Sequence, residues 1–304
     1  MSALRISAPV AAALGEGRPV VALESSVLAQ GLPIPANREA AERMVAAVEQ
    51  AGAVSAITAV VRGRSQGTAA LGLEPDELER FLARDGVRKV AARDLALACA
   101  QNADGATTVA ASLCIASAAG ATVFATGGIG GVHRDAPFDE SGDLLELSRT
   151  PMVVVCAGAK SILDLGATLE RLETLGVTVI GYRTDVLPGF FTRTTGLRLG
   201  ARADSAEEIA RAYRISGELG RPQAILVVQP PPEDVALPQQ EIDAAVATAL
   251  AKARAAGVRG AAVTPYLLNA VLSATEGRSL RTNLGLLESN ARLAGEIAVC
   301  LARD

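Results

Sequence analysis

Residues 152–176, MVVVCAGAKSILDLGATLERLETLG, decide the fold of this chain. The short valine-rich run Met152–Val155 is typical of a buried strand, and the apolar spacing over Ser161–Leu175 predicts a helix that Gly176 ends. Four small residues, CAGA, and Lys160 stand between them. The segment therefore predicts a strand that passes into a helix across a lysine, and α/β folds place ligands at such junctions.

The rest of the chain repeats this alternation of β-branched runs and Ala/Leu-rich helical patterns. It predicts a three-layer α/β/α sandwich around a mixed, largely parallel sheet, with residues 1–304 forming a single α/β catalytic domain. Residues 229–238, QPPPEDVALP, are the strongest break, which we interpret as a long loop. The predicted strands are Val20–Leu23, Ile57–Val61, Thr122–Ala125, Met152–Val155, Val177–Tyr182 and Ile225–Val228. The predicted helices are Asn37–Ala51, Thr108–Ala119, Ser161–Leu175, Ser205–Leu219, Gln239–Ala256 and most of Pro265–Ala302.

The composition argues against several functional classes. A net charge of −4 and an aromatic content of 3% lack the basic surface and the stacking side chains that nucleic-acid polymers require. No stretch approaches the roughly 20 apolar residues of a membrane span. The four cysteines lie far apart without a zinc-binding spacing, so we expect buried free thiols in a reducing compartment, the cytoplasm.

Lysine is scarce, because only three of the 29 basic residues are lysines. Lys252 falls in a helical surface pattern, whereas Lys89 and Lys160 adjoin apolar strands. Unlike arginine, a lysine can lose its proton, and apolar surroundings favour the neutral amine. We interpret Lys160 as a nucleophile towards a sugar carbonyl. The alternative is a lysine that lies along the strand end or only binds phosphate.

A glycine-rich stretch, GGIGG at residues 127–131, follows the strand predicted over Thr122–Ala125. Such loops often cradle phosphates, but a polar loop follows where a dinucleotide fold would begin an apolar helix. The oxygen ligands of that loop suit Mg²⁺ or Mn²⁺; the alternative is a surface loop that caps the next helix. The residues concerned are Asp139, Ser141, Asp143 and the only histidine, His133, a candidate for binding substrate.

Two other segments carry candidate polar residues. Glu24 directly follows the apolar strand Val20–Leu23, where desolvation would raise its pKa towards proton transfer; the alternative is a glutamate bonded to nearby hydroxyls or amides. Lys89 adjoins a short strand, and Thr107 and Thr108 stand where a helix is predicted to begin. Amides and hydroxyls at a positive helix end, beside a lysine, predict a phosphate pocket.

A set of motifs resembles the pseudouridine-5'-phosphate glycosidase family, also called the indigoidine synthase A family. They run in order from about residue 6 to residue 302 and include ALES, KVxxRD, GATTVAA, VFATGGIGGVHR, FDxSxDLxEL and VVCAGAKSILDLG. The resemblance implies a glycosidase or lyase of a C-nucleotide. Such an enzyme reversibly cleaves the C–C glycosidic bond of pseudouridine 5'-phosphate, through a lysine Schiff-base adduct, to uracil and ribose 5-phosphate. It also implies one Mn²⁺ per subunit and a homotrimer.

Site residues follow from the resemblance position by position. Lys160 in CAGAKS is implied to be the covalent nucleophile, Glu24 in ALES the proton donor, and Asp139 in the FD pair the metal ligand. Two positions depart from the pattern: Gln30 stands where members often carry histidine, and Ala91–Ala92 replace the serine and arginine of KVSRRD. The implied substrate contacts are Lys89, Val109, Ser141, Gly142 and Asp143, with Asn290 as a candidate for contacting uracil.

Three alternatives to this function stay open at this point. A Schiff-base lyase or aldolase acting on another sugar phosphate would use the same residues. A non-catalytic nucleotide- or metabolite-binding module would use the glycine loop but leave Glu24 and Lys160 without a role. An accessory part in pigment biosynthesis is suggested by the family's second name alone.

Overall fold

A mixed sheet runs through the computed structural model, which describes residues 3–134, 138–258 and 263–303. Its strands are β1 (Leu4–Ile6), β2 (Val20–Glu24), β3 (Val54–Val61), β4 (Thr68–Leu71), β5 (Arg88–Val90), β6 (Gly105–Thr107), β7 (Val123–Ala125), β8 (Val153–Cys156), β9 (Thr178–Tyr182), β10 (Ala201–Ala203) and β11 (Ile225–Val228). The order is β1-β4-β3-β2-β7-β8-β11-β9-β10, and β6 joins β3 to β5. Among the described strands, only β3 pairs antiparallel with its neighbours β4 and β6. The predicted mixed, largely parallel sheet is confirmed.

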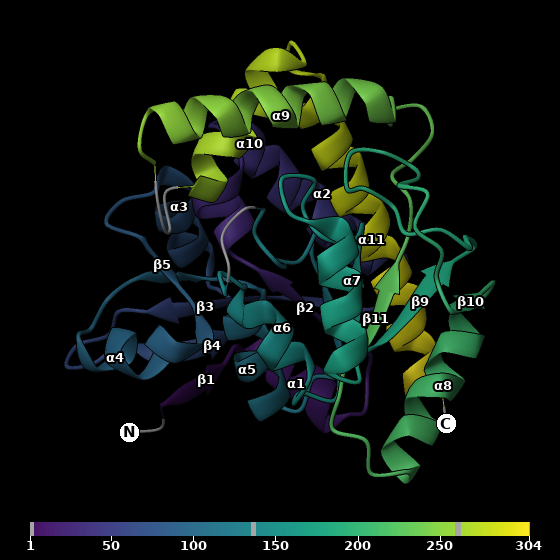
Figure 1. Cartoon of the computed structure of the whole chain (residues 1–304). Helices are drawn as coiled ribbons and strands as arrows, with labels where there is room; N and C mark the ends of the chain where they lie inside the picture. The colour runs from purple at the N-terminus through teal and green to yellow at the C-terminus, as the bar shows by residue number, and fades with distance from the viewer. Residues whose placement is uncertain (1–2, 135–137, 259–262, 304) are drawn as a thin grey trace.

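Helices cover both faces of the sheet. They are α1 (Ala8–Gly15), α2 (Ala36–Gln50), α3 (Pro75–Ala83), α4 (Leu95–Ala100), α5 (Val109–Ala118), α6 (Gly142–Leu147), α7 (Leu165–Thr174), α8 (Ala206–Glu218), α9 (Gln239–Ala255), α10 (Val263–Ala274) and α11 (Arg278–Ala302), with the short turns η1 (Val27–Gly31) and η2 (Ala92–Asp94). The helix α11 packs on β2, β7 and β8 and against α2 and α8, while α5 packs on β2, β3 and β4 beside α6. In Figure 1, α6 and α7 lie in front of the sheet, α2 and α11 lie behind it, and α9 crosses one end of the molecule.

The centre of the sheet is buried on both faces. The four residues of β8 and the first two of β7, Val123 and Phe124, are each 0% exposed. Strands in this position read as continuous apolar runs, because helices cover both sides. That is why the sequence identified the central strands; it missed the short strands β1, β4, β6 and β10.

Two predicted helices have different bounds. The helix expected from Ser161 begins at Leu165, because the side chain of Asp164 accepts a hydrogen bond from the Ala167 amide and caps it there. Gly176 follows its end with φ +71°, as predicted. The long helix expected over residues 265–302 is two helices, α10 and α11, which Gly277 separates with φ +79°.

The cysteines and the membrane prediction have clear outcomes. All four cysteines are free, but Cys156 alone is buried, and Cys99, Cys114 and Cys300 are half-buried, so the expectation of buried thiols was wrong for three of them. Within the described ranges, we find no helix with the length and hydropathy needed to cross a membrane.

Candidate active site

One pocket lies where the central strands end. Because β2, β7 and β8 are adjacent and parallel, their carboxyl ends meet at one edge of the sheet. Glu24 ends β2, the glycine stretch follows β7, and Lys160 follows β8. The pocket is lined by Glu24, Ser26, Val27, Gln30, Gly31, Lys89, Gly127, Gly128, Lys160, Phe190, Thr264, Leu268 and Asn283. The structure thus brings together Glu24, Lys89 and Lys160.

Glu24 is held as a buried acid. Its side chain is 5% exposed, and its two carboxylate oxygens accept hydrogen bonds from Thr126 Oγ1 at 2.5 Å and Ser26 Oγ at 2.9 Å. Burial raises the pKa of the Glu24 carboxyl, and the charge of Lys160 and the two hydroxyls oppose that shift. The two interpretations of the sequence are therefore compatible: Glu24 is bonded to hydroxyls, and it lines the pocket as a group that can hold a proton.

The small residues before Lys160 determine where the lysine stands. Its backbone amide donates to Ile129 O at 3.1 Å, so the segment after β8 lies against the glycine stretch after β7. Gly158 has φ +90°, and a Cβ there would stand 2.7 Å from Pro188 O. Any larger residue at this position would displace the backbone that carries Lys160.

Lys89 adds a second amine at the rim of the pocket, on strand β5. The residue is exposed overall, yet partial burial of its ammonium group lowers the Lys89 pKa, and the nearby charge of Lys160 lowers it further. Glu24 and Asp143 act in the opposite direction. The charges of Lys160 and Glu24 therefore act in opposite directions on the pKa of Lys89.

The expected phosphate cradle at Thr107 and Thr108 is not supported. The Thr107 amide donates to Ser25 Oγ at 2.9 Å, and the Thr108 amide donates to Val90 O at 3.0 Å. The Thr107 side chain is 0% exposed within a hydroxyl cluster, and the Thr108 side chain caps α5. Both backbone amides already donate to protein atoms, and neither residue lines the pocket. Lys89 therefore remains as a phosphate-binding candidate among the described residues.

Asp143 ties two elements of the site together. Its two carboxylate oxygens accept hydrogen bonds from the Ala110 amide at 2.9 Å and the Gly130 amide at 2.8 Å. Asp143 therefore holds the glycine stretch against the start of α5, and Ser141 caps α6 beside it. The other expected substrate contacts, Val109, Ser141, Gly142 and Asp143, do not line the described pocket. Their direct contact with substrate stays a prediction.

Asp139 lies on an exposed loop outside the pocket, and its carbonyl accepts a hydrogen bond from the half-buried His133's amide. Among the described residues, no three His, Cys, Asp or Glu side chains come together in a way that could enclose a metal ion. A single exposed carboxylate fits an ion that keeps most of its waters, as Mg²⁺ and Mn²⁺ commonly do. Asp139 is thus suited to a hydrated ion and not to an all-protein cage.

Two asparagines of α11 stand in different surroundings, and only Asn290 was expected at the site. Asn290 is 1% exposed, and its side chain donates to Thr126 O at 2.8 Å and accepts from Gln229 Nε2 at 2.9 Å. Asn290 therefore supports the glycine stretch and does not line the pocket. Asn283 does line it, and its buried Oδ1 has no hydrogen-bond partner in the described structure. The helical spacing could have indicated Asn283, because residues two helical turns apart, such as Asn283 and Asn290, share one face of a helix.

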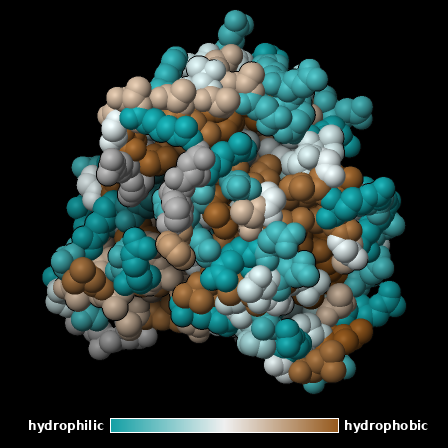
Figure 2. Space-filling model, in the orientation of Figure 1, coloured by the Kyte–Doolittle hydropathy of each residue, from teal (hydrophilic) through white to brown (hydrophobic). Residues whose placement is uncertain are grey.

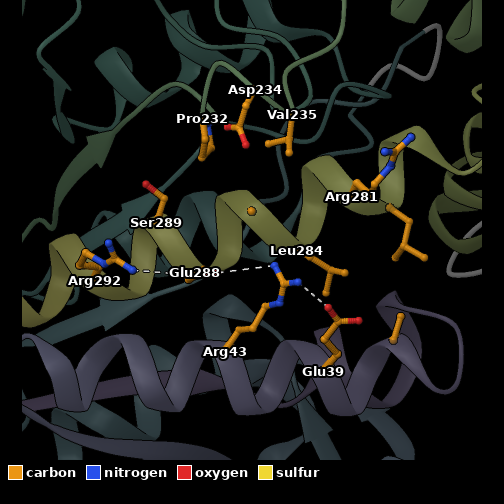
Figure 3. A pocket seen from close by; sticks show the side chains of 13 residues that line it. Glu39, Arg43, Pro232, Asp234, Val235, Arg281, Leu284, Glu288, Ser289 and Arg292 are labelled. Carbon is orange, nitrogen blue, oxygen red and sulfur yellow. Dashed lines mark hydrogen bonds and ion pairs between the residues drawn. The ribbon is translucent and has the colours of Figure 1, made fainter.

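A larger groove lies between α2, α11 and the loop 229–238, and Figure 3 shows its lining. Its charges neutralise one another: Arg43 pairs with Glu39 and Glu288, and Arg292 also reaches Glu288. The groove lining includes no lysine, histidine or cysteine. In Figure 2, hydrophobic residues show beneath the helix α9. Chemistry therefore favours the smaller pocket as the active site.

The chain is similar to known proteins over nearly its whole length. The family model described as indigoidine synthase A like protein matches residues 9–300. The pseudouridine-5'-phosphate glycosidase of Gemmatimonas aurantiaca is 65% identical over 297 residues, which cover 98% of this chain and 96% of that protein. That of Escherichia coli is 48% identical over 299 residues, covering 97% and 94%. The crystal structure of the prealnumycin C-glycosynthase in complex with ribulose 5-phosphate superposes with a TM-score of 0.90 at 41% identity, covering 98% and 97%.

Proposed function

The chain belongs to the indigoidine synthase A like family, and from that premise we propose that it reversibly cleaves the C–C glycosidic bond of pseudouridine 5'-phosphate to uracil and ribose 5-phosphate. The observation that carries the proposal is the pairing of Glu24 and Lys160 in one pocket with Lys89 at its rim. An acid, a nucleophilic amine and a phosphate-binding cation are the groups that this reaction needs.

The reaction needs an amine because a carbon leaving group has no lone pair to protonate. Lys160 Nζ, as the neutral amine, attacks C1' of the ribose while the C1'–O4' bond breaks, and O4' takes up a proton. The nitrogen lone pair then forms a C1'=N bond as the C1'–C5 bond breaks, and its electron pair takes up a proton at C5 of uracil. Water hydrolyses the imine to ribose 5-phosphate and frees the lysine.

Glu24 moves the protons in this sequence. Burial raises its pKa, so the carboxyl holds a proton more readily than an exposed glutamate. The hydroxyls of Thr126 and Ser26 keep the carboxylate oriented at the end of β2. We infer that Glu24 donates its proton to O4' during ring opening, takes up the proton that the Lys160 nitrogen loses as it regains its lone pair, and then donates that proton to C5 of the departing base.

Lys89 and Asn283 hold the two ends of the substrate. Lys89 supplies a positive charge at the rim, which suits the 5'-phosphate, and binding energy from that remote group aligns the reacting carbon. The Asn283 amide offers one acceptor and two donors, which match the N–H and C=O groups on an edge of uracil. Its unpartnered oxygen supports this assignment.

We also propose that Asp139 holds one hydrated Mn²⁺ per subunit, an ion that would supply positive charge and ordered water beside the polar loop. The enzyme is further proposed to act as a homotrimer, as the family resemblance implies. The four free cysteines support work in the reducing cytoplasm. Light scattering tests the trimer directly: a mass of one or two chains contradicts it.

The decisive test is uracil release from pseudouridine 5'-phosphate with and without Mn²⁺. Lys160→Arg and Lys160→Ala are expected to abolish release, whereas Lys252→Arg, on the exposed face of α9, keeps it. Full turnover by folded Lys160→Ala would overturn the mechanism.

Borohydride trapping decides between the two lysines of the pocket. The lowered pKa of Lys89 makes it the rival nucleophile. Reduction in the presence of ribose 5-phosphate is expected to add the sugar to the peptide that carries Lys160. A sugar adduct on the Lys89 peptide would make Lys89 the nucleophile and Lys160 the phosphate-binding cation. The absence of an adduct on both peptides would refute the imine.

A second candidate is a Schiff-base lyase or aldolase acting on another sugar phosphate. The observation in its favour is the structural relative at 41% identity, a C-glycosynthase described with the ketose ribulose 5-phosphate. The two functions share the same residues, so products separate them. Turnover of ribulose 5-phosphate without any release of uracil from pseudouridine 5'-phosphate would favour the second candidate.

A further inference from the structure

We propose that Gln30 is a further substrate-binding residue whose side-chain oxygen accepts a hydrogen bond from a hydroxyl of the ribose phosphate. This inference rests on the proposed function and deepens it. It concerns a position where the chain departs from the family pattern, so the family's known residues do not supply it.

The side chain of Gln30 has one polar atom already used and one left over. Gln30 belongs to η1 and lines the pocket with Glu24 and Lys89. Its Nε2 donates to Val87 O at 3.4 Å, a bond that keeps the amide nitrogen turned towards the chain before β5. Its Oε1 is buried and has no hydrogen-bond partner among the described residues. The oxygen is therefore the atom that remains for a ligand.

A buried acceptor without a donor is costly, and such groups in native proteins require an explanation. At the edge of a catalytic pocket, the simplest explanation is a donor that arrives with the substrate. The chemistry of the donor is restricted, because an amide oxygen only accepts. It cannot bind the oxygens of a phosphate dianion, so the ligand group must carry an O–H or N–H.

The position of Gln30 favours the sugar over the base. Val87, the partner of its Nε2, is two residues before Lys89, the phosphate-binding candidate. In the proposed reaction, C1 of the sugar is bonded to Lys160 and the phosphate on C5 is bound by Lys89. The hydroxyls of the intervening carbons must lie between these two lysines. Asn283 also lines the pocket, and its unpartnered oxygen is available for the base.

Gln223 provides a matched control. It is also a half-buried glutamine whose Oε1 is buried and without a partner in the described structure, but it does not line the pocket. Gln30→Met and Gln223→Met therefore remove the same chemical group at two sites, and only the first is beside the substrate.

The experiment measures the binding of ribose 5-phosphate, 2-deoxyribose 5-phosphate and 3-deoxyribose 5-phosphate to the whole enzyme by calorimetry. The wild type is expected to bind ribose 5-phosphate about 10- to 100-fold more tightly than one of the two deoxy sugars, the loss typical of a buried group left unpaired. Gln30→Met should lose that preference, and Gln223→Met should keep it. Gln30→Leu repeats the test if the methionine variant does not fold.

Three results would overturn the inference. The first is a sugar preference in Gln30→Met equal to that of the wild type. The second is an equal change in Gln223→Met. The third is a Gln30→Met enzyme whose KM rises for uracil but not for the sugar phosphate, because the oxygen would then serve the base. A wild type that binds ribose 5-phosphate with the Gln30-dependent preference but releases no uracil would refute the proposed function and leave the role of Gln30 intact.

Discussion

Asn283 and Asn290 of α11 offer a paired experiment, because one residue type stands on one helix in two different hydrogen-bond environments. Replacing each by alanine removes the same atoms and gives the same gain in helix propensity. Asn290→Ala loses two bonds of 2.8 and 2.9 Å and leaves Thr126 O and the Gln229 amide without their partner. Asn283→Ala loses no hydrogen bond within the described protein.

The magnitudes follow from those bonds. A buried group left unpaired costs about 1–3 kcal/mol, so two such groups make Asn290→Ala less stable than Asn283→Ala by about 2–6 kcal/mol. At about 2–4 °C per kcal/mol, its Tm should be lower by about 4–24 °C. The effect on binding is the reverse. Asn283→Ala is expected to raise the KM for uracil in the synthetic direction about 10-fold, which corresponds to about 1.4 kcal/mol.

Thermal melts measure the expected difference in Tm, and steady-state kinetics of uracil consumption with ribose 5-phosphate measure the expected difference in KM. The reasoning is refuted if the two variants melt together, because Asn290 would then not support the glycine stretch. It is equally refuted if Asn290→Ala, and not Asn283→Ala, raises the KM for uracil.

Three further changes test other parts of the site. Glu24→Gln should abolish turnover yet gain stability relative to the wild type as pH rises. Because folding raises the Glu24 pKa above its ordinary 4.5, the contribution of this carboxyl is full below the unfolded-state pKa and is lost as pH rises through the folded-state pKa. Thermal melts of both proteins, from below the unfolded-state pKa to above the folded-state pKa, measure this loss. A wild type that gains stability over Glu24→Gln as pH rises would contradict the expected sign. Asp139→Asn should raise the Mn²⁺ concentration for half-maximal activity by about 10-fold or more. Its Tm should stay unchanged, because the residue is exposed. A titration of activity with Mn²⁺ measures the first effect, and an unaltered titration curve would exclude Asp139 as the ligand. Gly158→Ala should lower the free energy of unfolding by at least about 1–3 kcal/mol, because an alanine is strained at a φ of +90°. It should also lose activity, because its Cβ would stand 2.7 Å from Pro188 O. Denaturant unfolding and turnover measure the two effects, and wild-type behaviour in both would show that the glycine is dispensable.

The binding groups were harder to predict than the strands and the placing of Glu24 and Lys160 at the ends of strands. Thr107 and Thr108 stand where α5 was expected to begin, and the helix does begin at Val109. Their amides nevertheless donate to Ser25 and to Val90. The sequence does not indicate which acceptor a given backbone amide will bind. A predicted helix N-terminus therefore does not establish that its donors are free for phosphate.

The sequence by itself determined the central strands and the switch from strand to helix around Lys160, and the family resemblance implied that Glu24 and Lys160 act together. Local apolar patterns define such strands, and parallel neighbours bring their carboxyl ends to one edge. Only the tertiary structure decided which polar side chains are left for a ligand. Asn290 is used by Thr126, which is 164 residues away, while Asn283 and Gln30 line the pocket and each keep a buried oxygen without a partner in the described structure. Hydrogen-bond partners of that kind depend on how distant segments pack, and local patterning contains no record of them.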